Sequence, residues 1–434
     1  MAVIIPFKGL RYNQQKINSL TTLVTPPYDI IDETAQARYY AENPANIIRL
    51  ELGMIFPQDS ASNNRYTRSS QYLEKWIADE ILQYEEKPAI YLYQQEFSIQ
   101  GQKMIRTGMV CGLKVEEYDQ GNILPHKETL SKPKADRLQL MRATRCNFSS
   151  IFGLYSDPDK FIGSTLLGQI GNRLPDISLI DEVNEIHKIW TITDNSVIDQ
   201  VVKYMADKNV YIADGHHRYE TALEYAKEMK EQGYSGYDYV MITLVNLFDE
   251  GLVVLPTHRL LGNIPHLNLG VLKQQLAELF EVEQLENYFD LTYFTNELKE
   301  RGKGKHVLGM YTNDSKAYIL TLKNNNQAFA LLPPEKSSAW KNLDVAILDN
   351  LILDQMLGIG EIERRSQNNL AYSHSPEWVV EQINNKNYQL GFIINSTRAE
   401  QVIDVAQAHD KMPPKSTYFY PQLITGLIIN HLGV

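Results

Sequence analysis

The sequence predicts a mixed α/β protein, of the α+β type, that is built from more than one domain. Its 434 residues correspond to two or three domains at about 150 residues each. Hydrophobic residues make up 43% and charged residues 22% of the chain, which is close to the globular average, so a large core can form. Segments with helical spacing alternate with strand-like segments along the whole chain. We expect three regions, over residues 1–120, 121–265 and 266–434.

The first region combines helix and strand signals. An extended segment, TPPYDII (25–31), precedes a helix that Asp32 caps and that ends at Asn43-Pro44. Apolar spacing predicts a further helix over 69–85. Two alternating segments, AIYLYQQEFSI and RTGMVCGLKVEEY, predict two neighbouring strands.

The second region holds a strand, a polar turn and a helix in succession. NVYIAD (209–214) is a short apolar strand, and helical spacing after Arg218 continues to a stop at Gly233. A strand over 187–193 and a helix capped by Asp194 come before it. The segments YVMITLVNLFD and GLVVLPTHRLL predict a β-hairpin around Glu250-Gly251.

The third region alternates helices and strands again. Its spacing predicts helices at LGVLKQQLAELF (269–280) and VAILDNLILDQML (345–357). Strands are predicted at KHVLGMYT (305–312), KAYILTLK (316–323), QAFALLP (327–333) and YQLGFIINS (388–396).

Charge and composition exclude several classes of function. The net charge is −11, from 42 Lys and Arg against 53 Asp and Glu, which argues against nucleic acid and anionic membrane surfaces as partners. Cys111 and Cys146 lie far apart and form no metal or disulfide pattern. No apolar run approaches the roughly 20 residues of a membrane span, and the apolar start of the chain is too short for a signal peptide. We expect a cytoplasmic protein, and the sequence leaves homo-oligomerisation open.

The turn between strand and helix concentrates groups that suit phosphate oxygens. Free N–H groups at a helix start bind anions, and a glycine allows close approach. We expect a nucleotide to contact Gly215, His216, His217, Arg218 and Tyr219. Asp214 ends the strand, where it could orient a histidine, position a metal or take a proton, so Asp214 and His216 are candidate catalytic residues. The alternative is a cap with locally bonded histidines. Zinc is disfavoured, because adjacent histidines rarely ligate one ion.

A basic cluster precedes the turn in an otherwise acidic chain. Within it, six basic residues face two acidic ones: Lys127, Lys132, Lys134, Arg137, Arg142 and Arg145 against Glu128 and Asp136. Such a cluster favours a small polyanionic ligand; its alternative interpretation is a solvated helix face. We take Glu128 as a candidate general base for an alcohol. The candidate substrate-binding residues here are His126, Lys134, Arg137 and Arg142.

Two weaker signals lie further along the chain. PTHRLL (256–261) contains a second His-Arg pair, and its Arg259 is a candidate substrate-binding residue, although such a pair is equally often structural. In PPKSTYFYP (413–421), Lys415, Ser416 and Thr417 resemble part of a phosphate loop. The GxxxxGK frame is absent, so a Walker motif is rejected.

Five segments together resemble the family called domain of unknown function 1015. They are TPPYDII (25–31), HKETLSKPKADRL (126–138), DGHHRYETA (214–222), LPTHRL (255–260) and PPKSTYFYP (413–421). The polar turn also resembles that of the ParB/sulfiredoxin-like superfamily, which implies a central core of that fold. Sulfiredoxins carry Gly-Cys-His-Arg at such a turn, and His217 and Arg218 match its last two residues. His216 stands in place of the cysteine, so sulfiredoxin chemistry is excluded.

Free serine kinases of this superfamily have an Asp-Gly-His-x-Arg turn, which residues 214–218 match in every fixed position. The resemblance implies an ATP- or ADP-dependent kinase that uses Mg²⁺ and phosphorylates a hydroxyl such as that of free L-serine. The alternative is a non-catalytic nucleotide-binding regulator or ParB-like switch. The net acidity and the lack of a basic helix-turn-helix pattern stand against a DNA-binding switch.

Overall fold

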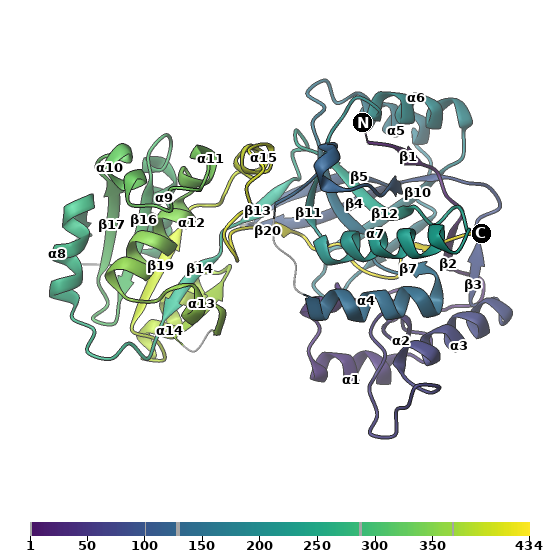
Figure 1. The fold of residues 1–434 in the computed structure, drawn as a ribbon, viewed down its shortest axis with the longest axis horizontal. Coiled ribbons are helices and arrows are strands. Elements are labelled where there is room, and N and C mark those ends of the chain that lie inside the picture. The colour runs from purple at the N-terminus through teal and green to yellow at the C-terminus, as the bar shows by residue number, and fades with distance from the viewer. Residues whose placement is uncertain (1, 100, 127–130, 286–288, 367–368) are drawn as a thin grey trace. The chain divides into compact units, whose positions relative to one another are not determined.

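The computed structural model confirms the mixed α/β class. It describes residues 2–99, 101–126, 131–285, 289–366 and 369–434. Contacts divide the chain into two compact units, unit 1 (Met1–Val253 with Pro421–Val434) and unit 2 (Val254–Tyr420). Unit 2 is therefore an insertion between two parts of unit 1 (Figure 1). Among the described residues, no helix combines the length and the apolar character needed to span a bilayer.

Unit 1 is organised around a nine-stranded sheet in which β1 pairs with β5 and the other strands run in the order β6-β11-β8-β12-β5-β4-β10-β9. The two strands predicted as neighbours, β4 and β5, form an antiparallel hairpin. A separate four-stranded sheet has the order β3-β2-β21-β7. The strands of unit 1 are β1 (Ile4–Ile5), β2 (Gly9–Tyr12), β3 (Leu82–Tyr84), β4 (Ile90–Ile99), β5 (Gln102–Lys114), β6 (Ile123–Pro125), β7 (Cys146–Asn147), β8 (Ile151–Tyr155), β9 (Ile177–Ile180), β10 (Ile186–Ile192), β11 (Val210–Asp214), β12 (Tyr239–Asn246) and β21 (Ile429–His431).

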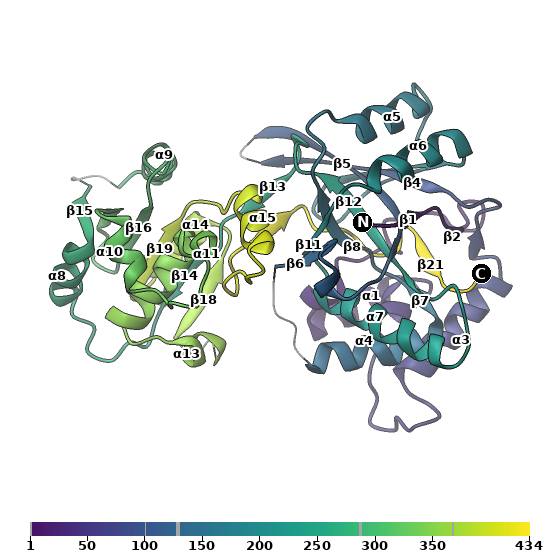
Figure 2. The same ribbon diagram turned by 45° about the horizontal axis from the view of Figure 1, so that its top comes forward.

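Two helices of unit 1 begin at the caps that the sequence predicts. The side chain of Asp32 accepts from the Ala35 N–H at the start of α1, and Asp194 caps α6 in the same way, as predicted. Helices α4 and α7 lie side by side (Figures 1 and 2). The helices are η1 (Tyr28–Ile30), α1 (Glu33–Glu42), α2 (Ile48–Glu51), α3 (Arg65–Ala78), η2 (Tyr118–Gln120), α4 (Ser131–Thr144), α5 (Phe161–Ile170), α6 (Asn195–Met205) and α7 (His216–Glu231).

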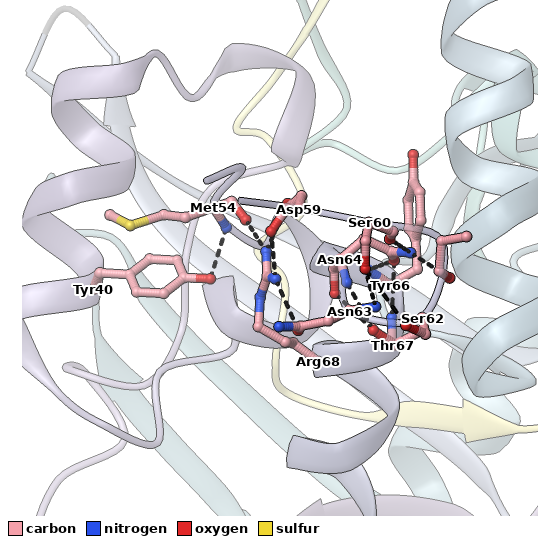
Figure 3. A network of polar contacts seen from close by, with 11 residues as sticks. Tyr40, Met54, Asp59, Ser60, Ser62, Asn63, Asn64, Tyr66, Thr67 and Arg68 are labelled. Atoms are coloured by element: carbon pink, nitrogen blue, oxygen red, sulfur yellow. Dashed lines mark hydrogen bonds and ion pairs between the residues drawn. The ribbon is translucent and has the colours of Figure 1, made fainter. Parts of the chain in front are cut away.

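A polar network fixes the start of α3, the helix that packs against α4 (Figure 3). The Asn64 side chain accepts from the N–H groups of Tyr66 and Thr67, and the Thr67 hydroxyl accepts from the Asn64 N–H, which completes a capping box. Arg68 binds both carboxylate oxygens of Asp59 at 2.6 and 3.0 Å. The Tyr66 hydroxyl then donates to Asp136 of α4 at 2.6 Å. The network thus holds α4 in place beside the turn.

Replacing Asn64 with alanine should lower the free energy of unfolding by about 1 kcal/mol, the usual value of an N-cap. The N–H groups of Tyr66 and Thr67 lose their acceptor in that variant. Urea unfolding measures the change. Ser62→Ala in the same loop is the control, because its hydroxyl makes one long contact of 3.4 Å with Ser60; it should cost less than about 0.5 kcal/mol. Equal losses in both variants would contradict the prediction.

Unit 2 contains a six-stranded sheet in the order β15-β17-β16-β19-β14-β18 and a two-stranded pair of β13 and β20. Its strands are β13 (Val253–Leu255), β14 (His258–Leu261), β15 (Phe280–Gln284), β16 (Val307–Thr312), β17 (Ala317–Leu322), β18 (Leu370–Ser373), β19 (Leu390–Ile394) and β20 (Tyr418–Tyr420). Its helices are α8 (Leu269–Leu279), α9 (Leu291–Arg301), α10 (Asn325–Ala330), α11 (Ser338–Lys341), α12 (Asp344–Ile347), the π-helix η3 (Leu348–Met356), α13 (Glu361–Ser366), α14 (Pro376–Asn384) and α15 (Ala399–Gln407).

Three local predictions were wrong. The hairpin around Glu250-Gly251 does not form, because β12 is buried along nearly its whole length and pairs with β5 and β8 on its two edges, which leaves no edge for β13. The segment over 327–333 lies mainly in α10, whose first N–H groups are capped by the Asn324 side chain. The predicted helix over 69–85 ends at Ala78 and gives way to β3.

The compact units also differ from the three regions expected from the sequence. β4 and β5 precede residue 120 and lie in the same sheet as β11 and β12, which follow it. Strand pairing across the whole sheet therefore joins the first and second regions within unit 1.

Candidate functional site

The polar turn joins the end of β11 to the start of α7, as predicted. Asp214 ends the strand, and Gly215 adopts a left-handed conformation with φ 90° and ψ 27° before the helix begins at His216. A Cβ at Gly215 would lie 3.0 Å from the Nε and Nη2 atoms of Arg218, so glycine suits this position for both conformation and space. The Tyr219 N–H donates to the Gly215 carbonyl at 3.0 Å, so the N–H groups of residues 216–218 precede the first bond of this helix.

Arg218 lies across the turn and is held at both ends of its guanidinium. Nη1 donates to the Ser150 carbonyl at 2.6 Å, and Nη2 lies 3.2 Å from Asp214 Oδ2. Of the two side chains, that of Arg218 is 12% exposed and that of Asp214 is 33% exposed. The arginine is therefore fixed in position, and Asp214 keeps a surface that a ligand can reach.

A second carboxylate, Asp29, lies beside the turn, although the sequence indicated no role for it. Burial and the neighbouring Asp214 carboxylate raise the pKa of Asp29, while Arg218 lowers it; part of its side chain nevertheless meets solvent. Burial also raises the pKa of the adjacent Tyr28 to about 12, against the opposing effect of Arg218. Two carboxylates from distant segments thus lie near Arg218. In the sequence, Asp29 could have been singled out because it lies in TPPYDII (25–31), one of the five segments that resemble the family.

The two histidines of the turn have different surroundings. His217 is half-buried, and burial lowers its pKa while Glu220 and Asp29 raise it. His216 is 5% exposed, its Nε2 accepts from the His126 N–H at 3.2 Å, and the two rings meet edge to face at 4.7 Å. His126 is itself buried and bonds the Ile212 carbonyl through Nδ1 at 2.6 Å. His216 and His126 therefore support the turn from inside, and His217 is the histidine near the surface.

Tyr219 does not lie with the expected nucleotide contacts. Its side chain is fully buried, and its hydroxyl donates to the Glu116 carbonyl at 2.7 Å and accepts from the Glu116 N–H at 2.9 Å. Its backbone N–H is used within the helix. Tyr219 follows the buried His216 by three residues, so it lies on the same inward face of α7.

Three members of the basic cluster, Lys134, Arg137 and Arg142, are paired with carboxylates. Lys134 bonds Glu220 at 2.9 Å and lies close enough to His217 to lower its pKa. Arg142 pairs with Glu228, three turns along α7 from the turn. Arg142 therefore lies far from the turn at which we expect the substrate to bind. Glu128 lies outside the described residues.

Arg137 is the buried member of the cluster. It is 6% exposed, donates to the Glu51 carbonyl and carboxylate at 2.9 and 3.0 Å, and binds Asp136 at 2.6 Å. Its guanidinium also stacks 4.0 Å from the centre of the Tyr28 ring. Arg137, Arg218, Glu51 and Ser149 line a small pocket of about 30 Å³, which can hold a water molecule but not a nucleotide. A nucleotide at this turn would therefore lie on its outer side.

The family model described as "Protein of unknown function (DUF1015)" matches residues 4–346. The chain belongs to the DUF1015 family. No curated protein matches this DUF1015 sequence.

Solved structures resemble this DUF1015 protein at low identity. Free serine kinase in complex with AMP is 12% identical, with 72% of this chain and 86% of that chain covered and a TM-score of 0.33. A conserved hypothetical protein from Pyrococcus furiosus is 12% identical, with 75% and 95% covered and a TM-score of 0.34. SbnI with C-terminal truncation from Staphylococcus aureus is 8% identical, with 74% and 87% covered and a TM-score of 0.35.

Arg259, the remaining predicted substrate contact, belongs to unit 2 of the DUF1015 chain. It is fully buried and bonds Asp349 with Nε at 3.2 Å and Nη2 at 3.3 Å. Its Nη1 donates to the Lys415 carbonyl at 3.1 Å. The side chain thus has partners within unit 2, and its predicted contact with a substrate stays a prediction.

One group of metal-ligating side chains occurs in the part of the DUF1015 chain that the structure describes, and it lies away from the turn. Its members are Asp181, Glu185 and His187. The ring of His187 already bonds the Tyr93 hydroxyl through Nδ1 at 2.7 Å and Asp181 through Nε2 at 3.2 Å. These bonds account for the histidine without an ion.

Proposed function

We propose that this protein binds ATP or ADP with its phosphates at the β11–α7 turn and transfers a phosphoryl group to the hydroxyl of a small molecule such as free L-serine. One observation carries the proposal. Gly215 in its left-handed conformation opens the start of α7, and Arg218 lies against it, bonded to Asp214 and near enough to Asp29 to lower its pKa. The resemblance of residues 214–218 to the turn of free serine kinases supports the same function.

Phosphoryl transfer requires positioning and neutralisation of charge more than covalent participation by the protein. The helix N-terminus and Arg218 supply donors for phosphate oxygens. His217, which its lowered pKa keeps neutral at pH 7, adds one more polar group at the surface. Lys134 is better placed than the buried Arg137 to meet an anionic group of the substrate.

The carboxylates have two tasks in this proposal. Asp214 and Asp29 would hold Mg²⁺, which usually takes one or two protein carboxylates besides the phosphates and neutralises their charge. One of them would also accept the proton of the substrate hydroxyl, and Asp214 leads because β11 fixes its backbone. Glu128 remains the other candidate base from the sequence.

The direct test is turnover. Purified protein is incubated with ATP or ADP, Mg²⁺ and L-serine, and the nucleotide product and phosphoserine are measured. Other hydroxy amino acids and sugars are tested as acceptors in parallel. Nucleotide binding without turnover on any acceptor would replace the kinase with the nucleotide-binding regulator, and absence of binding would reject both.

Replacing Arg218 with alanine should weaken nucleotide binding by about 1.5–3 kcal/mol, because charge-assisted hydrogen bonds to the phosphates are lost. Calorimetric titration with ADP measures the change, and circular dichroism checks the fold. Arg142→Ala is the matched control, since Arg142 pairs with Glu228, which lies three turns along α7 from the turn. An unchanged affinity in folded Arg218→Ala would refute the phosphate role.

Two glycine variants separate backbone strain from contact with Arg218. Gly215 and Gly121 both have positive φ, of 90° and 77°, but a Cβ at Gly121 meets nothing within 4 Å. Alanine at either position should cost about 1–2 kcal/mol of stability from the left-handed backbone. Gly215→Ala alone should also weaken ADP binding, because its methyl group displaces Arg218. Equal ADP affinities in the two variants would show that Gly215 is needed only for its conformation.

A further inference from the structure

Unit 2 contains a partly buried polar cluster that the proposed kinase site does not use. We call it the unit 2 polar cluster, and it comprises His258, Arg259, His374, Lys415 and Ser416. Strand pairing aligns His258 with Ser373, which brings His374 beside β14. The Arg259 guanidinium donates to the Lys415 carbonyl at 3.1 Å. Two of the sequence segments singled out above, PTHRLL and PPKSTYFYP, therefore meet inside this unit.

His258 presents a buried hydrogen-bond donor to this cluster. The residue is 2% exposed, and the Ile394 N–H donates to its Nδ1 at 3.3 Å. An Nδ1 that accepts carries no proton, so the neutral ring has its proton on Nε2. Nε2 is buried without a hydrogen-bond partner. His258 thus carries a buried donor that is unsatisfied.

Ser416 supplies a second unsatisfied group. It is 1% exposed, and its hydroxyl is buried without a partner, although its carbonyl accepts from the Thr397 hydroxyl at 3.1 Å. The preceding residue, Lys415, has a φ of 55°, which is a strained conformation for a residue with a side chain. A buried polar group without a hydrogen-bond partner is costly, and such groups are few in native proteins. We therefore infer that His258 Nε2 and Ser416 Oγ have a partner that belongs to a bound molecule.

The charge of the cluster identifies the kind of partner. Burial and the nearby Arg259 and His374 lower the pKa of His258 to about 3, so its ring is neutral at physiological pH. The exposed residue Lys415 adds positive charge, and Arg259 is paired with Asp349. The cluster therefore offers N–H, O–H and ammonium donors. A metal ion is disfavoured, because it needs a bare Nε2 and would meet positive neighbours.

We propose that the unit 2 polar cluster is a second binding site, distinct from the turn in unit 1, for an oxyanion group of a small molecule. His258 Nε2, Ser416 Oγ and Lys415 Nζ would donate to its oxygens. Arg259 holds the Lys415 backbone and is a positioning residue. Phosphate and carboxylate groups share this chemistry, and the test separates them.

The test is calorimetric titration of the full chain with inorganic phosphate and, separately, with acetate, at an ionic strength held constant with chloride. We expect one of the two anions to bind to the wild type. Ser416→Ala and His258→Asn should each weaken that binding at least tenfold; asparagine keeps an acceptor for the Ile394 N–H and lacks the Nε2 donor. Ser396→Ala, an exposed neighbour of Thr397, is the matched control and should bind like wild type.

Thermal unfolding without added anion shows whether a variant that loses anion binding is still folded. Ser416→Ala should be at least as stable as wild type, because it removes an unsatisfied buried hydroxyl. Phosphate binding lost in Ser416→Ala but kept in Arg218→Ala assigns the anion to unit 2, whatever the outcome of the kinase assay. Failure of both anions to bind, or equal binding by wild type and Ser416→Ala, would overturn the proposal and leave water as the partner of these groups.

Discussion

Replacing Arg137 with methionine should lower the free energy of unfolding by about 3–5 kcal/mol, the usual cost of breaking a buried ion pair from one side. Arg137 and Glu51 are 6% and 3% exposed, and two hydrogen bonds of 2.9 and 3.0 Å join them. Methionine fills a similar volume but leaves the Glu51 carboxylate in the core with the Ser149 hydroxyl, 3.0 Å away. Urea unfolding of the variant measures the loss.

Two further variants distinguish the cost of an unpaired buried charge from the cost of lost side-chain packing. Arg137→Met combined with Glu51→Gln should recover more than half of the loss, because the amide can be buried at lower cost than the carboxylate. Arg142 lies on α4 like Arg137, and Arg142→Met breaks its more exposed pair with Glu228 of α7, which should cost less than about 1 kcal/mol. Near-wild-type stability of Arg137→Met would contradict the burial of this pair.

Replacing Asp214 with asparagine should lower kcat by about 10²-fold or more, while the affinity for ADP measured without Mg²⁺ changes little. Asparagine keeps an oxygen that can accept from Arg218, 3.2 Å away, so the geometry of the turn survives. It cannot take up the hydroxyl proton, and it is a poorer ligand for Mg²⁺. Steady-state kinetics with saturating ATP and acceptor, together with calorimetric titration of ADP, separate the two effects.

Asp29→Asn is the companion variant, because the Asp214 carboxylate is near enough to raise the pKa of Asp29. A loss in kcat for both assigns the two carboxylates to one site. Asp199→Asn, an exposed aspartate on α6, is the matched control and should turn over normally. Wild-type rates in both Asp214→Asn and Asp29→Asn would remove these carboxylates from the mechanism.

Local signals in the sequence predicted the turn well. The apolar run before Asp214, the glycine after it and the helical spacing beyond Arg218 are each encoded within a few residues, and the strand, the left-handed Gly215 and α7 follow from them. The caps at Asp32 and Asp194 were predicted for the same reason. A side chain that bonds its own backbone two or three residues on needs no tertiary context.

Long-range pairing could not be predicted in the same way. Nothing near Arg137 in the sequence indicates Glu51, which lies 86 residues away, so a buried ion pair resembled a basic helix face. Asp29 approaches Asp214 only after η1 has packed beside the turn. The hairpin predicted after β12 failed because the partners of that strand are β5 and β8, which the local sequence does not specify.

The insertion of unit 2 has a consequence for biosynthesis. β2 and β7 lie on either side of β21 in the four-stranded sheet, and β21 follows the whole of unit 2 in the chain. At about 5–20 residues per second, a ribosome spends on the order of ten seconds or more on the intervening unit. The nascent chain carries open edges on β2 and β7 throughout that interval. Unpaired strand edges can pair with other chains. We therefore expect the nascent protein to need a chaperone before its translation ends.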